Sequence, residues 1–435
     1  MCVVHFVKEY PYWWDVPSGP ENPKRRTEPS LPARADVAIV GGGYTGLSAA
    51  RELARRGASV VVLERGSVGS GASGRNAGQV LTGLKLSPMT LVARFGRARA
   101  RQLFDISLEA IATLESLLRD EEIECEYERT GHLEAASKPS HFNALHEQQA
   151  ILESVFHHSV RVIPRANQHT EIGTSKYFGV MVDGRSAAID PAQYVRQLAA
   201  AARRSGAVIL EDTDVTAMAR HGAAWHVNTS RGAMQAGEVL VATNGYTDQT
   251  TAWLQRRFVA IGSYVIATAS LHEDRALALL PKRRMAFDSR HFLHYFRLTR
   301  DFRLLFGGRA EFTTPTGERT RRSARILQQD MISIFPSLAS VPIEYAWGGN
   351  VAFTRNQLPH AGRFKGAHYA GGYSGHGVAM STYLGGLTAR RMSGEAFEHP
   401  FFDEDDSYPA IPFYRGTPWF LPLAGAYYKL KDWVG

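Results

Sequence analysis

Hydrophobic and polar positions follow the periods of strands and helices along the chain, and the clearest pattern lies at residues 36–64. Two short apolar runs, Val37–Val40 and Val60–Leu63, predict buried strands. Between them, apolar side chains from Leu47 onward recur every three or four residues, which predicts a helix. We therefore expect a strand, a turn, a helix and a second strand.

Similar patterns continue downstream. Apolar residues from Leu103 to Leu118 recur at helical spacing, and Asp190-Pro191 is a typical start for a helix that stops at Gly206. Further helices are expected at 140–156 and, after a glycine loop at 371–377, as far as about Met392. Strands are expected near 126–134, 177–182, 207–210, 225–228, 233–235, 238–242 and 367–370, and within the β-rich, aromatic stretch 264–308.

The order of these elements predicts the fold class. Strands and helices alternate near both ends, and a β-rich stretch interrupts them. We expect an α/β protein, α+β overall, with a Rossmann-like domain and a discontinuous antiparallel-sheet domain that forms one wall of a pocket. Residues 1–34 are rich in proline, charge and aromatic side chains, so they are expected to form an arm across the body.

Composition narrows the class of protein. The 435 residues, 44% of them hydrophobic, can bury the cores of two domains. There is no run of about 20 apolar residues for a membrane span and no apolar signal-peptide region, so we expect a cytoplasmic protein. Cys2 and Cys125 are too few for a disulfide framework or a cysteine metal site, and we expect no metal.

The net charge of +8 raises the possibility of a nucleic-acid partner. Basic residues are, however, scattered among acids, and the densest runs, Lys282–Arg284 and Arg319–Arg325, are more typical of solvated faces. We expect a small-molecule substrate and no nucleic acid. The positive surface would favour the approach of an anionic substrate.

The first turn has the glycine spacing of a dinucleotide site. Gly41 allows a tight turn, Gly43 lets the backbone approach a pyrophosphate, and Gly46 lets the helix pack on the strand. The pyrophosphate would lie at the helix N-terminus. Glu64 could accept a hydrogen bond from a ribose hydroxyl, which favours FAD or NAD over NADP. The alternative is a tight turn without a ligand.

Four motifs together resemble the superfamily of FAD-dependent amine oxidoreductases that includes D-amino-acid oxidase, sarcosine oxidase and glycine oxidase. They are Val40–Ser48 with Glu64, Gly71–Gly78, Val241–Gly245 and Gly372–Gly377, in this order over most of the chain. Within the superfamily, residues 296–308, 373–377 and 424–430 are most similar to the γ-glutamylputrescine oxidases.

The resemblance implies FAD as the cofactor and a site that extends beyond the first turn. It implies an FAD-binding domain of residues 35–83, 187–260 and 342–398, a substrate domain of residues 84–186 and 261–341, an arm of residues 1–34 and a tail of residues 399–435. The expected cofactor-binding residues are Gly41, Gly43, Tyr44, Thr45, Gly46, Glu64, Arg65, Gly71, Ala72, Ser73, Arg75, Asn76, Gly78, Gln79, Val215, Thr243, Asn244, Gly245, Gly372, Ser374, Gly375, His376, Gly377 and Val378.

Two departures from the superfamily bear on the cofactor. The cysteine that links flavin in sarcosine oxidases corresponds to Val351, so we expect non-covalent FAD, with a histidine link as the alternative. The lysine that helps oxygen react in those enzymes corresponds to Leu305. That leaves open whether oxygen or another acceptor removes the electrons.

The expected catalytic residues belong to an aromatic pocket beside the flavin. Ring faces can hold a cationic amine and exclude water, and a guanidinium can pair with a carboxylate through two hydrogen bonds. The aromatic candidates are Tyr264, Tyr295, Tyr373 and Trp347, and the guanidinium candidate is Arg297, ahead of Arg303 and Arg309. His376 could donate a hydrogen bond beside the ring, or it could be a structural histidine.

These observations predict an enzyme that oxidises an amine or amino-acid C–N bond to an imine by hydride transfer to FAD. Water would hydrolyse the imine to an aldehyde or oxo acid. A substrate similar to γ-glutamylputrescine and oxygen as the acceptor, with hydrogen peroxide as a product, are favoured. The alternative is a flavin dehydrogenase or an electron-transfer flavoprotein subunit that uses another acceptor.

Overall fold

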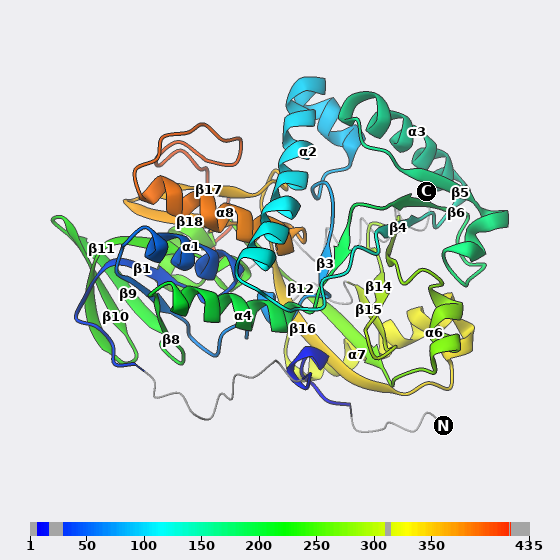
Figure 1. Cartoon of the computed structure of the whole chain (residues 1–435), viewed down its shortest axis with the longest axis horizontal. Coiled ribbons are helices and arrows are strands. Elements are labelled where there is room, and N and C mark those ends of the chain that lie inside the picture. Colours follow the sequence, from blue (N-terminus) through cyan, green and yellow to red (C-terminus); the bar gives the residue numbers. More distant parts are fainter. Residues whose placement is uncertain (1–6, 17–28, 309–314, 417, 419–435) are drawn as a thin grey trace.

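Two eight-stranded sheets, each flanked by helices, make up the computed structural model (Figure 1). The structure describes residues 7–16, 29–308, 315–416 and 418. No helix in these ranges is long and apolar enough to cross a membrane. Cys2, Arg309 and the tail motif at 424–430 lie outside the described residues.

The first sheet is built around the predicted strand, helix and strand. Its order is β17-β18-β11-β1-β2-β8, and β10 and β9 extend it from β11. β1 pairs in parallel with both β2 and β11, and its apolar run is buried, as expected of a central parallel strand. The strands are β1 (Arg34–Val40), β2 (Val60–Leu63), β8 (Val208–Leu210), β9 (Val215–His221), β10 (Ala224–Thr229), β11 (Gly232–Val241), β17 (His360–Phe364) and β18 (Ala367–Gly371).

Three helices pack on one face of this sheet (Figure 1). α1 (Tyr44–Arg55) contacts both α4 (Pro191–Arg204) and α8 (Gly377–Met392). α1 and α8 approach so closely that a Cβ atom on Gly385 would lie 2.4 Å from the carbonyl oxygen of Thr45. The hydroxyl of Ser48 also donates to the carbonyl oxygen of Thr382 at 2.7 Å. The two helices are therefore in backbone contact.

The second sheet has the order β16-β12-β15-β14-β13-β4-β6-β5. Its neighbouring strands are antiparallel except for β13 and β4, so the expected antiparallel sheet has one parallel pair. α6 (Glu273–Leu279) and α7 (Gly317–Ile334) cover one face with apolar side chains. The strands are β4 (His132–Ala135), β5 (Arg161–Pro164), β6 (Gly179–Asp183), β12 (Val259–Thr268), β13 (Met285–Asp288), β14 (Tyr295–Leu298), β15 (Leu304–Gly308) and β16 (Ile343–Phe353).

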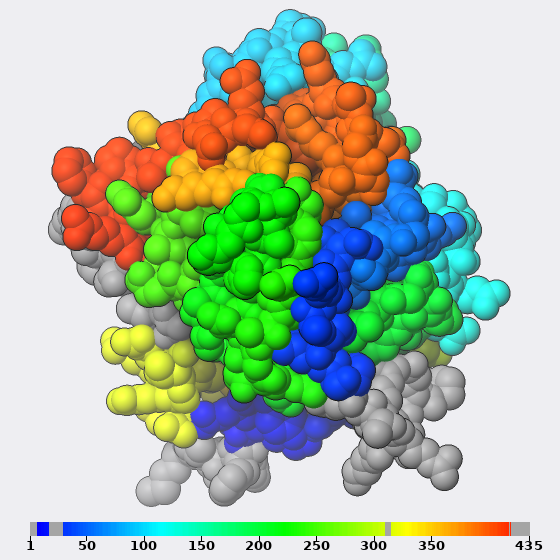
Figure 2. Space-filling view, turned by 90° about the vertical axis from the view of Figure 1, so that its left-hand side faces the viewer, coloured from blue at the N-terminus to red at the C-terminus, as the bar shows by residue number. Residues whose placement is uncertain are grey.

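Further helices and a small third sheet accompany the two large sheets. α2 (Pro88–Asp120) contacts α3 (Pro139–Phe156) and α8, and it bends at Gly96, where φ is 73°. A two-stranded sheet of β3 (Gln79–Val80) and β7 (Ala187–Ala188) begins at the end of loop 69–79. We call this loop the cofactor loop, because its sequence predicts contact with FAD. Figure 2 views the molecule from the side of the first sheet, with β9 to β11 in green at the centre and residues 7–16 in dark blue at the lower edge.

Some expected elements differ from the structure. The expected strands 233–235 and 238–242 form one strand, β11, because its first half pairs with β10 and its second half with β1 and β18. The strand expected from 126 begins only at His132, and Glu126 has a φ of 52°, which interrupts extended backbone. α7 was not expected. The first half of its sequence is rich in basic residues, so the helical spacing of its buried residues, which include Leu327 and Met331, was not recognised. The domain boundaries stay a prediction.

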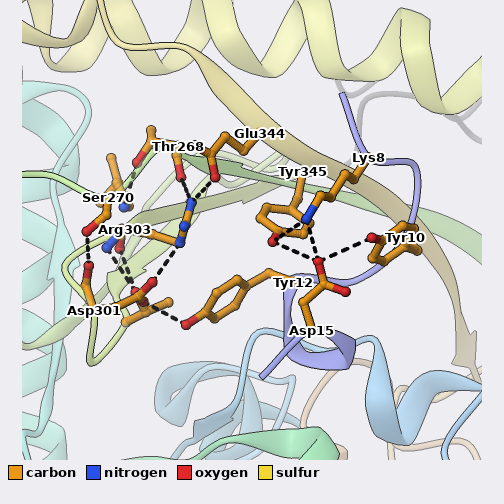
Figure 3. A network of polar contacts seen from close by, with 12 residues as sticks. Lys8, Tyr10, Tyr12, Asp15, Thr268, Ser270, Asp301, Arg303, Glu344 and Tyr345 are labelled. Atoms are coloured by element: carbon orange, nitrogen blue, oxygen red, sulfur yellow. Dashed lines mark hydrogen bonds and ion pairs between the residues drawn. The ribbon is translucent and has the colours of Figure 1, made fainter. Parts of the chain in front are cut away.

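Residues 7–16 dock on the second sheet and on the cofactor loop. Tyr12 and Trp13 are buried among Val265, Leu305 and Tyr345. A network of polar contacts surrounds them, and Figure 3 shows Lys8 and Asp15 beside Tyr345, and Tyr12 beside Asp301. The hydroxyl of Tyr12 donates to Asp301 at 2.6 Å, and the guanidinium of Arg303 donates to the other oxygen of Asp301 at 2.7 Å.

Trp13 links this segment to the cofactor loop. Its side chain is 1% exposed, and its indole N–H donates to the carbonyl oxygen of Asn76 at 3.0 Å. Loss of so large a buried side chain leaves a cavity and an unpaired carbonyl group.

We expect Trp13→Ala to lower the free energy of unfolding by about 3–5 kcal/mol, as measured by urea denaturation. Phe413→Ala is the control because Phe413 is 89% exposed, and its change should stay within about 0.5 kcal/mol. A Trp13→Ala protein as stable as the control would show that the segment does not contribute to the stability of the fold.

Candidate active site

A cavity of about 790 Å³ lies between the two sheets. Its lining begins at the glycine turn after β1, follows the loop 69–79 and the N-terminus of α8, and ends on the second sheet. A volume of this size is typical of a site that binds a small molecule or a cofactor. Residues that are far apart in the sequence therefore meet at one site.

The glycine turn joins β1 to α1 at one end of this cavity. Gly41 has a φ of +108°, and a Cβ atom there would lie 2.9 Å from the carbonyl oxygen of Ala242. A Cβ atom on Gly46 would lie 2.0 Å from the carbonyl oxygen of Gly41. Glycine is therefore required for the turn and for the approach of helix to strand. Gly43, Tyr44 and Thr45 line the cavity, whereas Gly46 lies behind it.

Glu64 is fixed at the end of β2, beside the turn. Its carboxylate accepts hydrogen bonds from the backbone N–H groups of Gly42 at 2.6 Å and Gly66 at 3.1 Å. Arg65 pairs with Asp248 at 2.9 Å. Glu64, Arg65 and Val215 all line the cavity, and their contact with an adenosine group stays a prediction.

The loop after β2 is held by its own side chains. The backbone N–H of Tyr44 donates to the hydroxyl of Ser73 at 3.0 Å, which ties the loop to the start of α1. The amide of Asn76 donates to Ala72 O and Ser73 O and accepts from the N–H of Gly78. Gly71, Ala72, Ser73, Arg75, Asn76 and Gln79 line the cavity, whereas Gly78 does not.

The turn after β11 is joined to the turn after β18. Asn244 has a φ of 44°, and its side-chain oxygen accepts from the N–H of Gly372 at 2.9 Å. Thr243 and Asn244 line the cavity, but Gly245 packs against the backbone of Asn350, and Gly372 is not among the lining residues. This contact positions the loop before α8.

The N-terminus of α8 faces the cavity. Ser374, Gly375, His376, Gly377 and Val378 line it, and the unpaired N–H groups of a helix N-terminus favour negative charge there. Tyr373 also lines the cavity, and its hydroxyl is 2.7 Å from the hydroxyl of Thr45 on α1. The two cofactor-facing helices are thus connected by side chains as well as by backbone.

His376 is a neutral imidazole. Burial lowers its pKa to about 3, and the positive charge of Lys85 acts in the same direction, as would protonation of His132. Its Nδ1 atom is buried and has no hydrogen-bond partner in the described structure. A bound group could therefore use this nitrogen.

The buried polar atoms support a bound polar cofactor. In the described chain, Gln79 Nε2, Asn350 Oδ1 and His376 Nδ1 have no hydrogen-bond partner, and all three residues line the cavity. Buried donors and acceptors are normally paired. Gln79 Nε2 can donate, Asn350 Oδ1 can accept, and His376 Nδ1 can do either. The polar edge of a flavin ring has both acceptors and a donor, so these residues fit FAD.

Three expected pocket residues lie outside the cavity lining. Tyr264 is on the opposite face of β12 from Ser263 and Val265, which do line the cavity, because side chains alternate along a strand. Arg297 donates to the carbonyl oxygen of Gly78 at 3.0 Å and lies over the ring of Trp13 at 5.2 Å. Burial lowers the pKa of Arg297 to about 10.

Trp347 is the third expected residue outside the cavity lining, and like Arg297 it is bonded to the backbone of the loop 69–79. Its indole N–H donates to the carbonyl oxygen of Arg75 at 2.8 Å, and its ring is 1% exposed. Arg303 binds Asp301 and Glu344 and supports the docked residues 7–16.

Among the expected pocket residues, His376, Tyr373 and Tyr295 reach the cavity.

Sequence reasoning missed a group of polar residues on the second sheet. His132 and Glu134 alternate with buried apolar residues on β4, and both line the cavity. This alternation of polar and apolar residues was the signal that could have revealed them. Other polar lining residues were also missed, on this sheet and its connecting loops (Asp183, Asp288, Ser289, Arg290 and Asn350) and on neighbouring elements (Lys85 and Gln148).

A charged cluster adjoins this wall at the end of β13. Burial alone would lower the pKa of His294, but hydrogen bonds to Asp288 and Asp330, each at 3.1 Å, raise it to about 9. Arg290 lies 3.7 Å from Asp288 and lines the cavity. The cluster therefore brings a guanidinium to the cavity. Among the described residues, no group of three or more His, Cys, Asp or Glu side chains is arranged so that it could hold a metal ion.

Comparisons with known proteins agree with this geometry. The family model "DAO: FAD dependent oxidoreductase" matches residues 36–391. The chain is 33% identical over 405 residues to γ-glutamylputrescine oxidoreductase of Escherichia coli, covering 92% of this chain and 93% of that protein. It is 32% identical over 416 residues to probable oxidoreductase OrdL of Rhizobium meliloti, covering 94% and 95%.

Solved structures share the fold. Glycine oxidase from Geobacillus kaustophilus superposes with a TM-score of 0.73 at 19% identity, covering 88% of this chain and 99% of that one. L-proline dehydrogenase from P. horikoshii superposes with a TM-score of 0.69 at 21% identity, covering 85% and 96%. These similarities confirm the expected fold class.

We expect Gly43→Ala to weaken FAD binding, because the added methyl group would lie 2.9 Å from the hydroxyl of Ser73 and would narrow the turn. The purified variant should contain less FAD per polypeptide, measured by absorbance, and a higher Kd on reconstitution. Gly184→Ala is the control, since no atom lies within 4 Å of its added Cβ. Equal FAD content in both variants would argue against the turn as the pyrophosphate site.

We expect His376 to give the folded protein a pH-dependent stability. Its pKa is about 3 when folded and about 6.5 when unfolded, so protons bind the unfolded state and stability is lost as the pH falls below about 6.5. Relative to His376→Gln, the wild type should lose about 1–2 kcal/mol between pH 7.5 and pH 5, measured by urea denaturation. A constant difference would mean that His376 titrates normally.

Proposed function

The chain belongs to the DAO family of FAD-dependent oxidoreductases, and on this premise we propose that it oxidises a γ-glutamylputrescine-like amine. The family confirms the expected cofactor, FAD, and an oxidoreductase that acts on amines or amino acids. The proposed reaction converts a C–N bond to an imine, which water hydrolyses to an aldehyde and ammonia or an amine. Oxygen is the proposed electron acceptor, and hydrogen peroxide is its product.

One observation carries the proposal: a single cavity connects the dinucleotide turn of the first sheet to a polar and aromatic wall on the second. Gly43, Glu64 and Ser73 would hold the ADP portion, and the loop before α8 would hold the flavin ring. FAD, when bound, supplies the two-electron acceptor for the hydride. Val351 lines the cavity where the related enzymes carry a linking cysteine, which supports non-covalent binding.

The chain's own residues would stabilise charge and exclude water. The N-terminal amides of α8 favour negative charge on the cofactor edge that they face. A neutral His376 can donate or accept one hydrogen bond there without adding a full charge. Phe287 and Tyr295 provide apolar ring surfaces on the opposite sheet. Such surfaces hold the substrate carbon near the cofactor and keep bulk water out.

Charges on the second sheet support the substrate class. Glu134 and Arg290 both line the cavity and carry opposite charges when ionised. A molecule with an amine at one end and a carboxylate at the other is complementary to such a pair. γ-Glutamylputrescine has these two groups, and the name of the Escherichia coli relative supports the same substrate.

We expect γ-glutamylputrescine to bleach the flavin absorbance when mixed with the enzyme without oxygen. Putrescine, which lacks the carboxylate, should bleach it at least about tenfold more slowly because it cannot pair with a guanidinium. Admission of oxygen should then restore the absorbance and yield peroxide. No bleaching across a broad amine panel would refute the amine oxidase. Bleaching without peroxide would identify a dehydrogenase with another acceptor.

A further inference from the structure

We propose that Glu134 is the base that binds the substrate's ammonium group in the cavity and takes up its proton. The inference rests on the proposed function, because an amine must lose its proton before hydride leaves the neighbouring carbon. Neither Glu134 nor any other residue of the second sheet belongs to the motifs that identify the FAD site.

The register of the second sheet brings Glu134 to the cavity. Glu134 on β4 is paired with Met181 on β6 and with Phe287 on β13, and Phe287 is paired with Tyr295 on β14. Paired residues of neighbouring strands project to the same face, and all four line the cavity. The adjacent residues Leu133 and Ala135 are buried in the core on the other face. Glu134 is therefore an acid set among apolar and aromatic side chains.

Gln148 holds the carboxylate in place. Its Nε2 atom, on α3, donates to Glu134 Oε2 at 2.9 Å. Within the described structure this is the one hydrogen bond of the carboxylate, which leaves Oε1 to accept from a ligand. Part of Glu134 remains exposed, and the residue lines the cavity. An ammonium group with an apolar chain suits this arrangement, because the rings of Phe287 and Tyr295 also attract cations.

Glu134 on the second sheet and His376 on the cofactor side share one charged neighbour. Lys85, from the loop before α2, interacts electrostatically with both Glu134 and His376. His132, two residues earlier on β4, also interacts with His376, and burial lowers the pKa of His132. Lys85 is thus the cation that faces Glu134, and the two histidines are neutral near pH 7.

Burial raises the pKa of Glu134, although the hydrogen bond from Gln148 and the charge of Lys85 oppose the shift. A carboxylate in such a site binds a proton more readily than one in water. When a cationic amine enters, one N–H bond breaks and a Glu134 O–H bond forms, while the lone pair stays on nitrogen. The neutral amine could then lose a hydride from the adjacent carbon, with FAD, when bound, as its acceptor, and a protonated imine would remain.

The test uses the holoenzyme with Glu134→Gln, in which the amide can still accept from Gln148. Glu153→Gln is the matched control, because Glu153 lies on the exposed side of α3 and accepts from Gln149 at 3.2 Å in a similar Gln–Glu pair. Anaerobic flavin reduction by γ-glutamylputrescine at pH 7 should fall about 100-fold or more in Glu134→Gln. The rate for Glu134→Gln should then rise about tenfold for each unit by which the pH is raised toward the pKa of the amine. The variant can use only substrate that is already neutral in solution. The control should match the wild type.

A second measurement does not require oxidation. Tetramethylammonium is a cation that cannot give up a proton, and calorimetry should show it bound at least about tenfold more weakly by Glu134→Gln than by the wild type or Glu153→Gln. Tert-butanol, a neutral molecule of similar size, should bind all three equally. The variant should also gain thermal stability over the wild type as the pH rises above about 4.5, because it no longer buries an ionising carboxylate.

These outcomes separate the two proposals. If no amine bleaches the flavin but tetramethylammonium binding depends on Glu134, the proposed reaction is wrong and the cation site stands. If γ-glutamylputrescine bleaches the flavin of Glu134→Gln at the wild-type rate and with the wild-type pH profile, the role of Glu134 is overturned.

Discussion

The backbone contact between α1 and α8 is the constraint on which the site depends. Gly385 allows the contact, and the hydrogen bond between Ser48 and Thr382 fixes how the two helices cross. Each helix begins with a glycine-containing turn, and each turn lines the same cavity. Because interiors are closely packed, a shift of one helix would displace both turns. One helix pair thereby positions the pyrophosphate end and the ring end of the cofactor site.

The cofactor half of the site could be predicted from sequence because its signals are local. Gly41, Gly46 and Glu64 belong to one unit of strand, turn, helix and second strand, and the structure places them as that unit requires. The signal for the loop before α8 is equally local. Gly372 and Gly375 adopt positive φ angles there, and glycine is the residue type that such angles favour. Where the contacting residues are close together in the sequence, their types and spacing are enough to predict the contact.

The substrate half could not be predicted in the same way. Tyr264 and Tyr295 are both aromatic residues in strands, yet one faces a helix layer and the other faces the cavity. Their orientation follows from the pairing of β12, β14 and β15, which no local pattern specifies. Arg297 lies two residues beyond Tyr295, but Trp13 and the loop at Gly78 cover it. Side-chain type alone does not say which face of a sheet is open.

The docked residues 7–16 also have a consequence for the order in which the chain folds during synthesis. Lys8 and Tyr345, which share a hydrogen bond, are separated by 337 positions. Ribosomes add about 5–20 residues per second, so Lys8 emerges many seconds before the strand on which it docks. Val265, Leu305 and Tyr345, on which Tyr12 and Trp13 pack, are likewise made long after them. The lining of the cavity itself runs from Val40 to Ser381, so the pocket is complete only when nearly the whole described chain has been made. Contacts of such long sequence separation are typical of slowly folding proteins.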